Sequence, residues 1–210
     1  MHSPSTIIEA HGPLLILDAA SSRIQVGLLG PGGHSRWAAR TEEAGVGIFQ
    51  CLEDLGVDID AVGAFAFCDG PGSILGARSA AAVLRSWNVL RSRPTYAYNG
   101  LSLVAHALED DALSVVADAR RGLWHRYRLG GALERVPAEA LTGPLVTPEG
   151  FRHWDPLPAD TATTPYDLAR LVASPAAARA AIFTLTDEPD AFLHQEPAYA
   201  TWVPQIHRAP

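Results

Sequence analysis

Two aspartates stand at the ends of apolar runs, where a carboxylate could act in catalysis or hold a metal ion. Asp18 follows the strand-like run 14–17, and Asp118 follows the run 113–117. Two carboxylates that meet between lobes could serve as general acid and base or as metal ligands. Aspartate also caps hairpin turns through hydrogen bonds with nearby backbone N–H groups. The sequence leaves both interpretations open.

A glycine-rich turn, Gly70-Pro71-Gly72-Ser73, separates an apolar run at 61–68 from an alanine-rich stretch that reaches Leu90. Glycines between a strand and a helix allow another group to approach the backbone closely. A phosphate on the helix N-terminus is one candidate, but the turn lacks both the P-loop lysine and a GxGxxG spacing. Ser73 is also placed to cap the helix. The sequence favours the cap.

Other catalytic groups are sparse. The chain contains no lysine, which excludes Schiff-base chemistry, and it has no GxSxG nucleophile motif. Its eight histidines are never three to five residues apart, so no helical metal-binding pair is present. A Ser-His-Asp triad stays open because its members can be distant in sequence. We assign no catalytic residue and no metal ligand.

The hydrophobic pattern around these residues predicts an α/β fold. Strands are expected at 14–18, 24–29, 34–40, 61–68 and 94–98, and helices at 46–55, 74–90 and 101–108. The first three strands form an antiparallel meander, and the later strands are reached through crossover helices. This order implies a mixed sheet covered by helices.

A second set of elements follows the acidic segment 109–111. It has strands at 113–117 and 123–129, and Asp118 again ends a strand before a hairpin. The two halves are therefore interpreted as a diverged repeat. We expect a disordered or loosely attached N-terminus at 1–12, a first lobe at 13–109 and a reduced second lobe at 110–210. Its C-terminal part is proline-rich and irregular, with short helices near 166–172 and 176–182.

Composition limits the class of protein. The chain has 210 residues, 48% of them apolar, and a net charge of -7 without a basic run, which argues against a nucleic-acid-binding surface of its own. Its two cysteines fit reduced thiols. No segment approaches the roughly 20 apolar residues of a membrane helix, and no signal pattern is present. A soluble cytoplasmic protein is expected.

The helix after the glycine turn is unusually small-sided. Gly72, Gly76 and Ala80 are spaced four residues apart, and Val83 and Leu84 add apolar area. A helix without bulky side chains lets another backbone approach closely, either from its own fold or from a second chain. Internal packing and a protein interface both explain this pattern.

In this order and at this spacing, the motifs resemble the TsaB (YeaZ) family, a subunit of the bacterial machinery that makes threonylcarbamoyladenosine in tRNA. The motifs are Leu14–Asp18 with its small-residue turn, the Gly70–Ser73 turn with its helix, Asp118-Ala119-Arg120-Arg121-Gly122, and Glu196-Pro197-Ala198-Tyr199. The chain departs from the family at Ile74-Leu75, where Phe-Thr is usual.

The resemblance implies an actin-like, hexokinase-like (ASKHA) fold with two RNase H-like lobes. It also implies a non-catalytic subunit without a cofactor of its own. A TsaD-like partner would hold the metal and nucleotide and transfer the threonylcarbamoyl group, a TsaE-like ATPase would join the assembly, and tRNA would be contacted only indirectly. A homodimer would use the same helical face. The alternatives are a small ATP-dependent phosphotransferase of this fold, or a homodimeric scaffold without a role in tRNA modification.

Two sets of site residues follow. The expected partner interface comprises Ile48, Phe49, Leu52, Gly70, Pro71, Gly72, Ser73, Gly76, Ala77, Ala80, Val83 and Leu84. The expected remnants of a degenerate nucleotide site are Asp18, Ser21, Asp118, Arg120 and Arg121.

Overall fold

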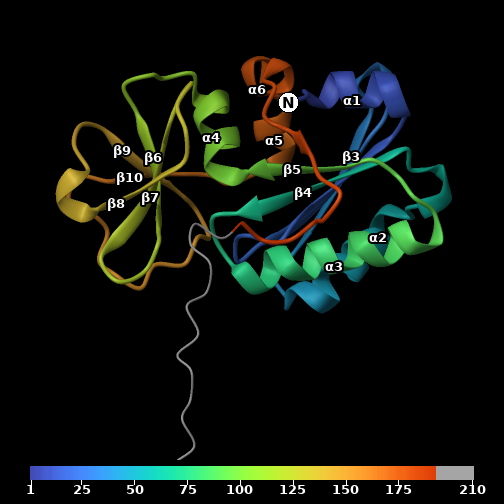
Figure 1. Ribbon diagram of the computed structural model, residues 1–210, viewed down its shortest axis with the longest axis horizontal. Coiled ribbons are helices and arrows are strands. Elements are labelled where there is room, and N and C mark those ends of the chain that lie inside the picture. Colours follow the sequence, from blue (N-terminus) through green and yellow to red (C-terminus); the bar gives the residue numbers. More distant parts are fainter. Residues whose placement is uncertain (193–210) are drawn as a thin grey trace, which may run out of the picture.

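The computed structural model describes residues 1–192, which form two β-sheets with helices packed around the first (Figure 1). The first sheet has the strand order β11-β5-β4-β1-β2-β3, and the second has the order β10-β9-β6-β7-β8. Apart from β11, the two sheets pass through five strands in the same order. In each sheet the first three strands pair antiparallel and the first strand pairs parallel with the fourth. This topology confirms the predicted mixed α/β fold and the diverged repeat.

The first sheet contains β1 (Leu14–Asp18), β2 (Ile24–Leu29), β3 (Ser35–Arg40), β4 (Ala64–Gly70), β5 (Thr95–Asn99) and β11 (Thr184–Leu185). The second contains β6 (Ser114–Asp118), β7 (Leu123–Arg128), β8 (Glu134–Pro137), β9 (Leu145–Pro148) and β10 (Ala162–Thr164). The helices are α1 (Pro4–His11), α2 (Ala44–Leu55), α3 (Ile74–Leu90), α4 (Gly100–Leu108), α5 (Leu168–Ala173) and α6 (Pro175–Arg179). Within residues 1–192, no helix has both the length and the apolar character that crossing a bilayer requires.

Strand β1 is central to the first lobe and is buried on both faces. Leu14 and Ile16 join one hydrophobic cluster, whereas Leu15 and Leu17 join the other. This alternation follows from the two-residue period of a strand. Helices α2 and α3 cover one face of the sheet, and α1, α5 and α6 lie on the opposite side (Figure 1). An uninterrupted aliphatic run is therefore required at β1.

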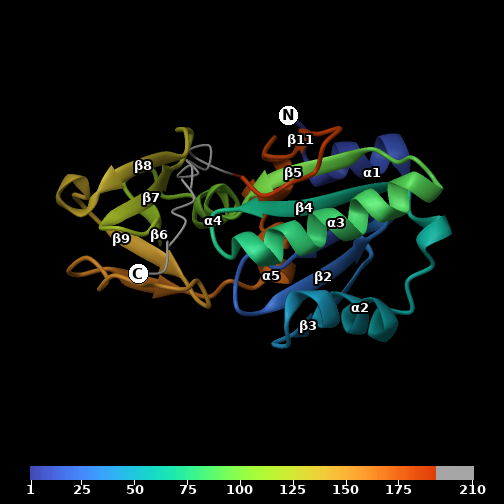
Figure 2. The same cartoon turned by 60° about the horizontal axis from the view of Figure 1, so that its bottom comes forward.

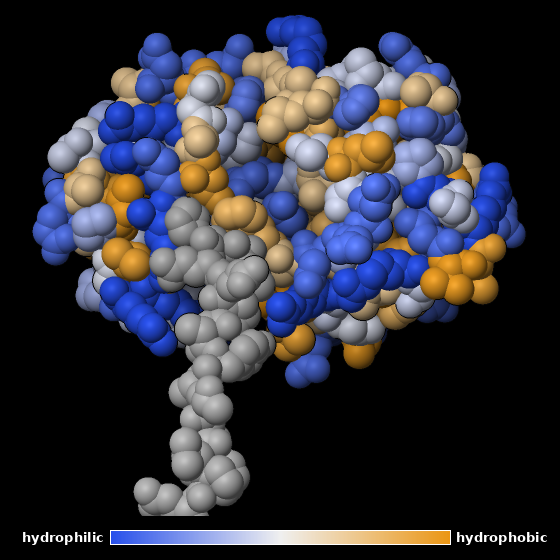
Figure 3. Space-filling model, viewed as in Figure 1, coloured by the Kyte–Doolittle hydropathy of each residue, from blue (hydrophilic) through white to orange (hydrophobic). Residues whose placement is uncertain are grey.

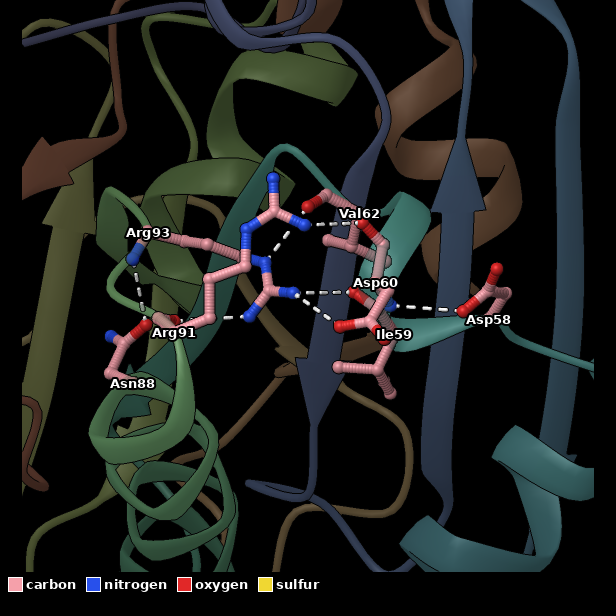
Figure 4. A network of polar contacts seen from close by, with 7 residues as sticks. All are labelled: Asp58, Ile59, Asp60, Val62, Asn88, Arg91 and Arg93. Atoms are coloured by element: carbon pink, nitrogen blue, oxygen red, sulfur yellow. Dashed lines mark hydrogen bonds and ion pairs between the residues drawn. The ribbon is translucent and has the colours of Figure 1, made fainter.

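Hydrogen bonds from Arg93 fix the C-terminal end of α3. Its side chain is 4% exposed and donates hydrogen bonds to the carbonyl oxygens of Val62 and Ile59, at 2.9 and 2.8 Å (Figure 4). The side-chain carbonyl of Asn88 accepts a hydrogen bond from the Arg93 backbone N–H. Because an arginine can be buried only when its donors are paired, this network fixes where α3 ends and β5 begins.

Helix α4 joins the lobes. It begins directly after β5, where the Asn99 side chain accepts hydrogen bonds from the N–H groups of Leu101 and Ser102. Its buried residues belong to the same hydrophobic cluster as Val115 and Ala117 of β6. The two sheets consequently share one continuous core.

The second lobe is reduced, as predicted. Residues 110–165, all of them described, contain five strands and one short 3-10 turn at Ala138–Ala140, but no α-helix. The separate cluster on this sheet consists of Val116, Trp124 and Leu145. This lobe therefore depends on α4 for much of its packing.

The N-terminus differs from expectation. Residues 4–11 form α1, which Ser3 caps, and Ile7 is 1% exposed within the main core. The backbone of His2 also pairs with that of Phe183 in both directions. The prediction of a disordered or loosely attached segment at 1–12 was wrong because a single buried isoleucine and two hydrogen bonds are a weak signal in sequence.

The C-terminal segment also corrects the predicted lobe boundary. Residues 166–192 return to the first lobe, where β11 pairs with β5 and α5 packs in the main core. The Gln25 side chain donates to the Tyr166 carbonyl oxygen at 2.9 Å and accepts from the Leu168 N–H at 2.9 Å. The assignment of all of 110–210 to the second lobe was wrong, since these pairings join residues 87 to 143 positions apart, which local sequence patterns do not reveal.

Candidate functional site

The glycine turn lies between the lobes, where α3 begins facing the second sheet (Figure 2). Ser73 caps α3 as predicted, because its Oγ accepts a hydrogen bond from the Gly76 N–H at 3.1 Å. A Cβ atom on Gly72 would lie 2.2 Å from the Ala20 carbonyl oxygen, and the Gly72 φ of 144° is one that favours glycine. The group that approaches this turn is therefore the chain's own backbone after β1.

Asp18 is enclosed in the core. Its Oδ2 accepts hydrogen bonds from the phenols of Tyr98 and Tyr166, each at 2.7 Å, and its Oδ1 accepts from the Ala20 N–H. Burial raises the pKa of this carboxyl, and the three hydrogen bonds oppose that rise without cancelling it. With 0% of its surface exposed, Asp18 cannot meet a nucleotide or a metal ion in this structure. Its place among the remnants of a degenerate nucleotide site therefore stays a prediction, and its carboxylate is closed off from solvent.

Asp118 ties two turns of the second lobe together. Its Oδ1 accepts from the Arg120 N–H, and its Oδ2 accepts from the N–H groups of Trp154 and Asp155 at 2.8 and 2.9 Å. Burial raises the pKa of Asp118, but these hydrogen bonds outweigh it and hold the pKa below its usual value. The Asp155 carboxylate in turn accepts from the Gly122 N–H. We call this arrangement the Asp118 clasp.

The hairpin turn within the clasp places arginines beside an aromatic ring. Arg120 and Arg121 have φ angles of 64° and 59°, in the left-handed region that residues other than glycine seldom occupy. The Arg120 Cζ atom lies 4.2 Å from the centroid of the Trp154 ring, and the Arg152 Cζ atom lies 5.2 Å from it. The structure thus brings Arg120 together with two residues that the sequence did not single out.

A groove runs between the clasp and the glycine turn. It consists of adjoining cavities of 290 and 600 Å³ that share Gly72, Ser73, Ile74, Asp118, Arg120 and Trp154. Ser21 lines the larger cavity, although its hydroxyl is used by the Arg23 backbone. Among the predicted remnants, Ser21, Asp118, Arg120 and Arg121 therefore meet at one groove, and Asp18 does not.

Asp69 and Arg135 also line the groove and were missed in the sequence. Burial raises the Asp69 pKa to about 7, and its Oδ1 has no hydrogen-bond partner among the described residues. Arg135 of β8 donates to the Ala119 carbonyl oxygen and so supports the clasp. Arg152 and Trp154 were missed as well, although the run Phe151-Arg152-His153-Trp154-Asp155 is aromatic and charged inside a proline-rich segment and could have indicated them.

The expected partner interface was wrong for most of its residues. Those buried in the first lobe are Ile48, Leu52, Gly70, Pro71, Gly76, Ala77, Ala80 and Leu84. A Cβ atom on Gly76 would lie 1.9 Å from the Ala19 carbonyl oxygen, so the inward face of α3 is small because it packs closely on its own fold. Phe49 and Ser73 are exposed, and Gly72 and Val83 are half-buried.

No cluster of three or more histidine, cysteine, aspartate or glutamate side chains suited to a metal ion occurs within residues 1–192. No family model matches the chain, and no curated protein matches its sequence.

Among solved structures, the chain is similar to YeaZ from Pseudomonas aeruginosa, with a TM-score of 0.57 and 23% sequence identity over 77% of this chain and 89% of that one. A second structure, an uncharacterized protein with similarity to peptidase YEAZ from Pseudomonas aeruginosa, matches with a TM-score of 0.57 and 22% identity over the same shares. The resemblance in the motifs and the likeness in three dimensions thus point to the same group. The chain therefore has the fold of YeaZ, with two mixed β-sheets and helices.

Proposed function

We propose that this chain is a non-catalytic, TsaB-like subunit that binds and supports a TsaD-like threonylcarbamoyl transferase in tRNA modification. The fold shared with YeaZ carries the proposal. The ordered motifs at β1, the glycine turn and Asp118 support it, and two of them, Asp18 and Asp118, end the equivalent strands β1 and β6 of the two lobes. A TsaE-like ATPase would complete the assembly, and tRNA would be reached through the partners.

The outward face of α3 is the surface we assign to the partner. It consists of Leu75, Ser79, Ala82, Ser86 and Val89, which recur at alternating spacings of four and three residues. Leu75 is 77% exposed and Val89 is 86% exposed. We call this set the outer stripe; Figure 3 shows a hydrophobic patch at the right-hand edge, where α3 ends.

The outer stripe suits close approach of another helix. The hydroxyls of Ser79 and Ser86 donate to the carbonyl oxygens of Leu75 and Ala82, each at 2.9 Å. Because these hydroxyls are paired within α3, the stripe can be covered without leaving their donors unpaired. Phe49 belongs to α2, the helix that packs beside α3, and is 53% exposed. A homodimer through the same surface would compete with the TsaD-like partner.

The two aspartates support a non-catalytic role. Asp18 is closed off by tyrosine hydroxyls, and both oxygens of Asp118 accept backbone hydrogen bonds. A phosphotransferase of this fold would need one of these carboxylates to face the substrate or its metal ion. The structure therefore favours the scaffold over the phosphotransferase.

The test is reconstitution with the TsaD-like protein of the same organism. We expect the mixture to elute as one complex in size-exclusion chromatography with light scattering at micromolar concentration, and its transferase activity to require this chain. Absence of a complex with and without nucleotide would contradict the proposal. If the two proteins form a complex but the TsaD-like protein is equally active without this chain, only the supporting role is contradicted.

A further inference from the structure

Two arginine side chains lie beside the Trp154 ring. Arg120 and Arg152 approach its centroid to 4.2 and 5.2 Å, and neither forms an ion pair with a carboxylate of residues 1–192. Two guanidinium groups beside one ring repel each other, and an anion near both would offset that repulsion. We call these three residues the arginine–tryptophan stack. Neither guanidinium is thus neutralised by a direct ion pair within the described part of the chain.

The groove around the stack concentrates positive charge in a chain whose net charge is -7. Arg78 shares the larger cavity with the stack, and Arg121 and Arg135 line the smaller one. Arg78 is paired with Asp190 at 3.3 Å. The carboxylates in the groove offset this charge only partly. Asp118 is already engaged by backbone N–H groups, and burial raises the pKa of Asp69 to about 7.

The stack is held in place by the backbone. The Asp118 clasp binds the N–H groups of both Arg120 and Trp154, so a single carboxylate positions both partners. Arg120 also keeps a positive φ, which a residue with a side chain adopts at an energetic cost. Such cost is common where a functional group must be aimed in one direction.

The opposite wall of the groove is the N-terminus of α3. Ser73 and Ile74 line both cavities, and the first turn of this 17-residue helix contains no acidic residue. The helix dipole places partial positive charge at this end. Both walls of the groove thus favour a negative group between them.

We infer that this groove binds a phosphate group, with the guanidinium groups of Arg120 and Arg152 as its main ligands. Guanidinium matches phosphate because it can donate two parallel hydrogen bonds while carrying the opposite charge. A free nucleotide or the backbone of an RNA could supply the phosphate. The inference does not depend on the proposed partner, since every residue that carries it belongs to this chain.

The experiment is isothermal titration of the full chain at low ionic strength with three probes: sodium pyrophosphate, ATP and a single-stranded oligouridylate. The double variant R120A/R152A is compared with R170A/R179A, which removes two exposed arginines of α5 and α6 outside the groove. Both variants lose the same charge. We expect R120A/R152A to weaken binding by at least about tenfold and R170A/R179A to change it less than about twofold.

The arms of this experiment separate the sources of phosphate. Binding of pyrophosphate or ATP identifies a small ligand, whereas binding of the oligouridylate alone identifies an RNA backbone, and either result supports the site. The inference is overturned if no probe binds below about 1 mM, if R120A/R152A binds like the wild type, or if R170A/R179A weakens binding equally. Thermal unfolding of each variant checks that it is folded, and W154A, which removes the ring but no charge, should also weaken binding.

Discussion

The phenol of Tyr166 donates a 2.7 Å hydrogen bond to Asp18, which lies 148 residues earlier in the chain. This contact brings the segment that returns from the second lobe against the end of the central strand. It also occupies one of the two carboxylates that could serve a phosphotransferase of this fold. This hydrogen bond thus attaches the returning segment to the first lobe and also closes off the Asp18 carboxylate.

Removing that hydroxyl should destabilise the fold. Tyr166→Phe leaves a buried carboxyl with one donor fewer, so we expect the free energy of unfolding to fall by about 1–3 kcal/mol. Urea denaturation measures this change. Tyr127→Phe, at a half-buried tyrosine of β7, is the matched control and should change stability by less than about 0.5 kcal/mol. Equal losses in the two variants would contradict the role given to Tyr166.

Asp69 should make stability depend on pH. Its folded pKa of about 7 lies above the unfolded value of 3.8, so the folded state retains a proton that the unfolded state has lost. Its contribution to stability is complete below the unfolded pKa and is lost as pH rises through about 7. We expect the free energy of unfolding to fall by at most about 1.4 kcal/mol for each pH unit in this window.

Denaturation of the wild type and of Asp69→Asn across this window measures the effect. The variant cannot titrate at residue 69, so the difference in stability between the two proteins should change with pH and level off above about pH 8. A constant difference at every pH would show that the pKa of Asp69 is the same in the folded and unfolded states, which would contradict the prediction.

The outer stripe gives the test of the partner surface. Ala82→Arg places a charged side chain on the exposed side of α3 and should abolish the complex with the TsaD-like protein, or a homodimer, while the chain stays folded. Ala10→Arg, on the exposed side of α1, should leave assembly unchanged. Size-exclusion chromatography and circular dichroism report the two properties. Intact assembly of the Ala82 variant would remove the stripe from the interface.

Ala80 provides the contrasting variant. This residue lies on the inward face of α3 and is 0% exposed. Ala80→Arg should therefore unfold the first lobe and not alter binding selectively. A thermal transition like that of the wild type would show that the packing beneath α3 is looser than the structure indicates.

The Asp118 clasp should stabilise the second lobe specifically. Asp118→Ala leaves the N–H groups of Arg120, Trp154 and Asp155 without their acceptor, at a cost of about 1–3 kcal/mol. Hydrogen exchange should accelerate at 119–122 and 153–155 and change little in α2. Because its folded pKa is lowered, the contribution of Asp118 is present above the unfolded pKa and is lost as the solution is acidified.

Much of the fold was predictable because local patterns carry it. The apolar run at β1, the left-handed Gly56 after α2 and the Ser73 cap on α3 each lie where sequence rules place them. The repeat of strand, aspartate and hairpin predicted two lobes of one topology. These features depend on neighbours within one or two turns of chain, which is why the sequence reveals them. The motif Glu196-Pro197-Ala198-Tyr199 lies outside the described residues.

The tertiary structure decided which face of α3 is free. Small residues occur on both sides of this helix, as Ala80 and Ala82 illustrate, so composition does not tell the buried face from the exposed one. Likewise Trp154 and Arg152 come from an irregular segment, and only the Asp118 clasp brings them to Arg120.

The two aspartates also show which properties the sequence determines and which the tertiary structure determines. By sequence alone, Asp18 and Asp118 are equivalent, because each ends an apolar strand and precedes an alanine and a hairpin. Their roles differ because distant segments supply their partners: tyrosine hydroxyls close Asp18 in the core, and backbone N–H groups hold Asp118 at the groove. The local chain places each carboxylate, and the fold determines what surrounds it.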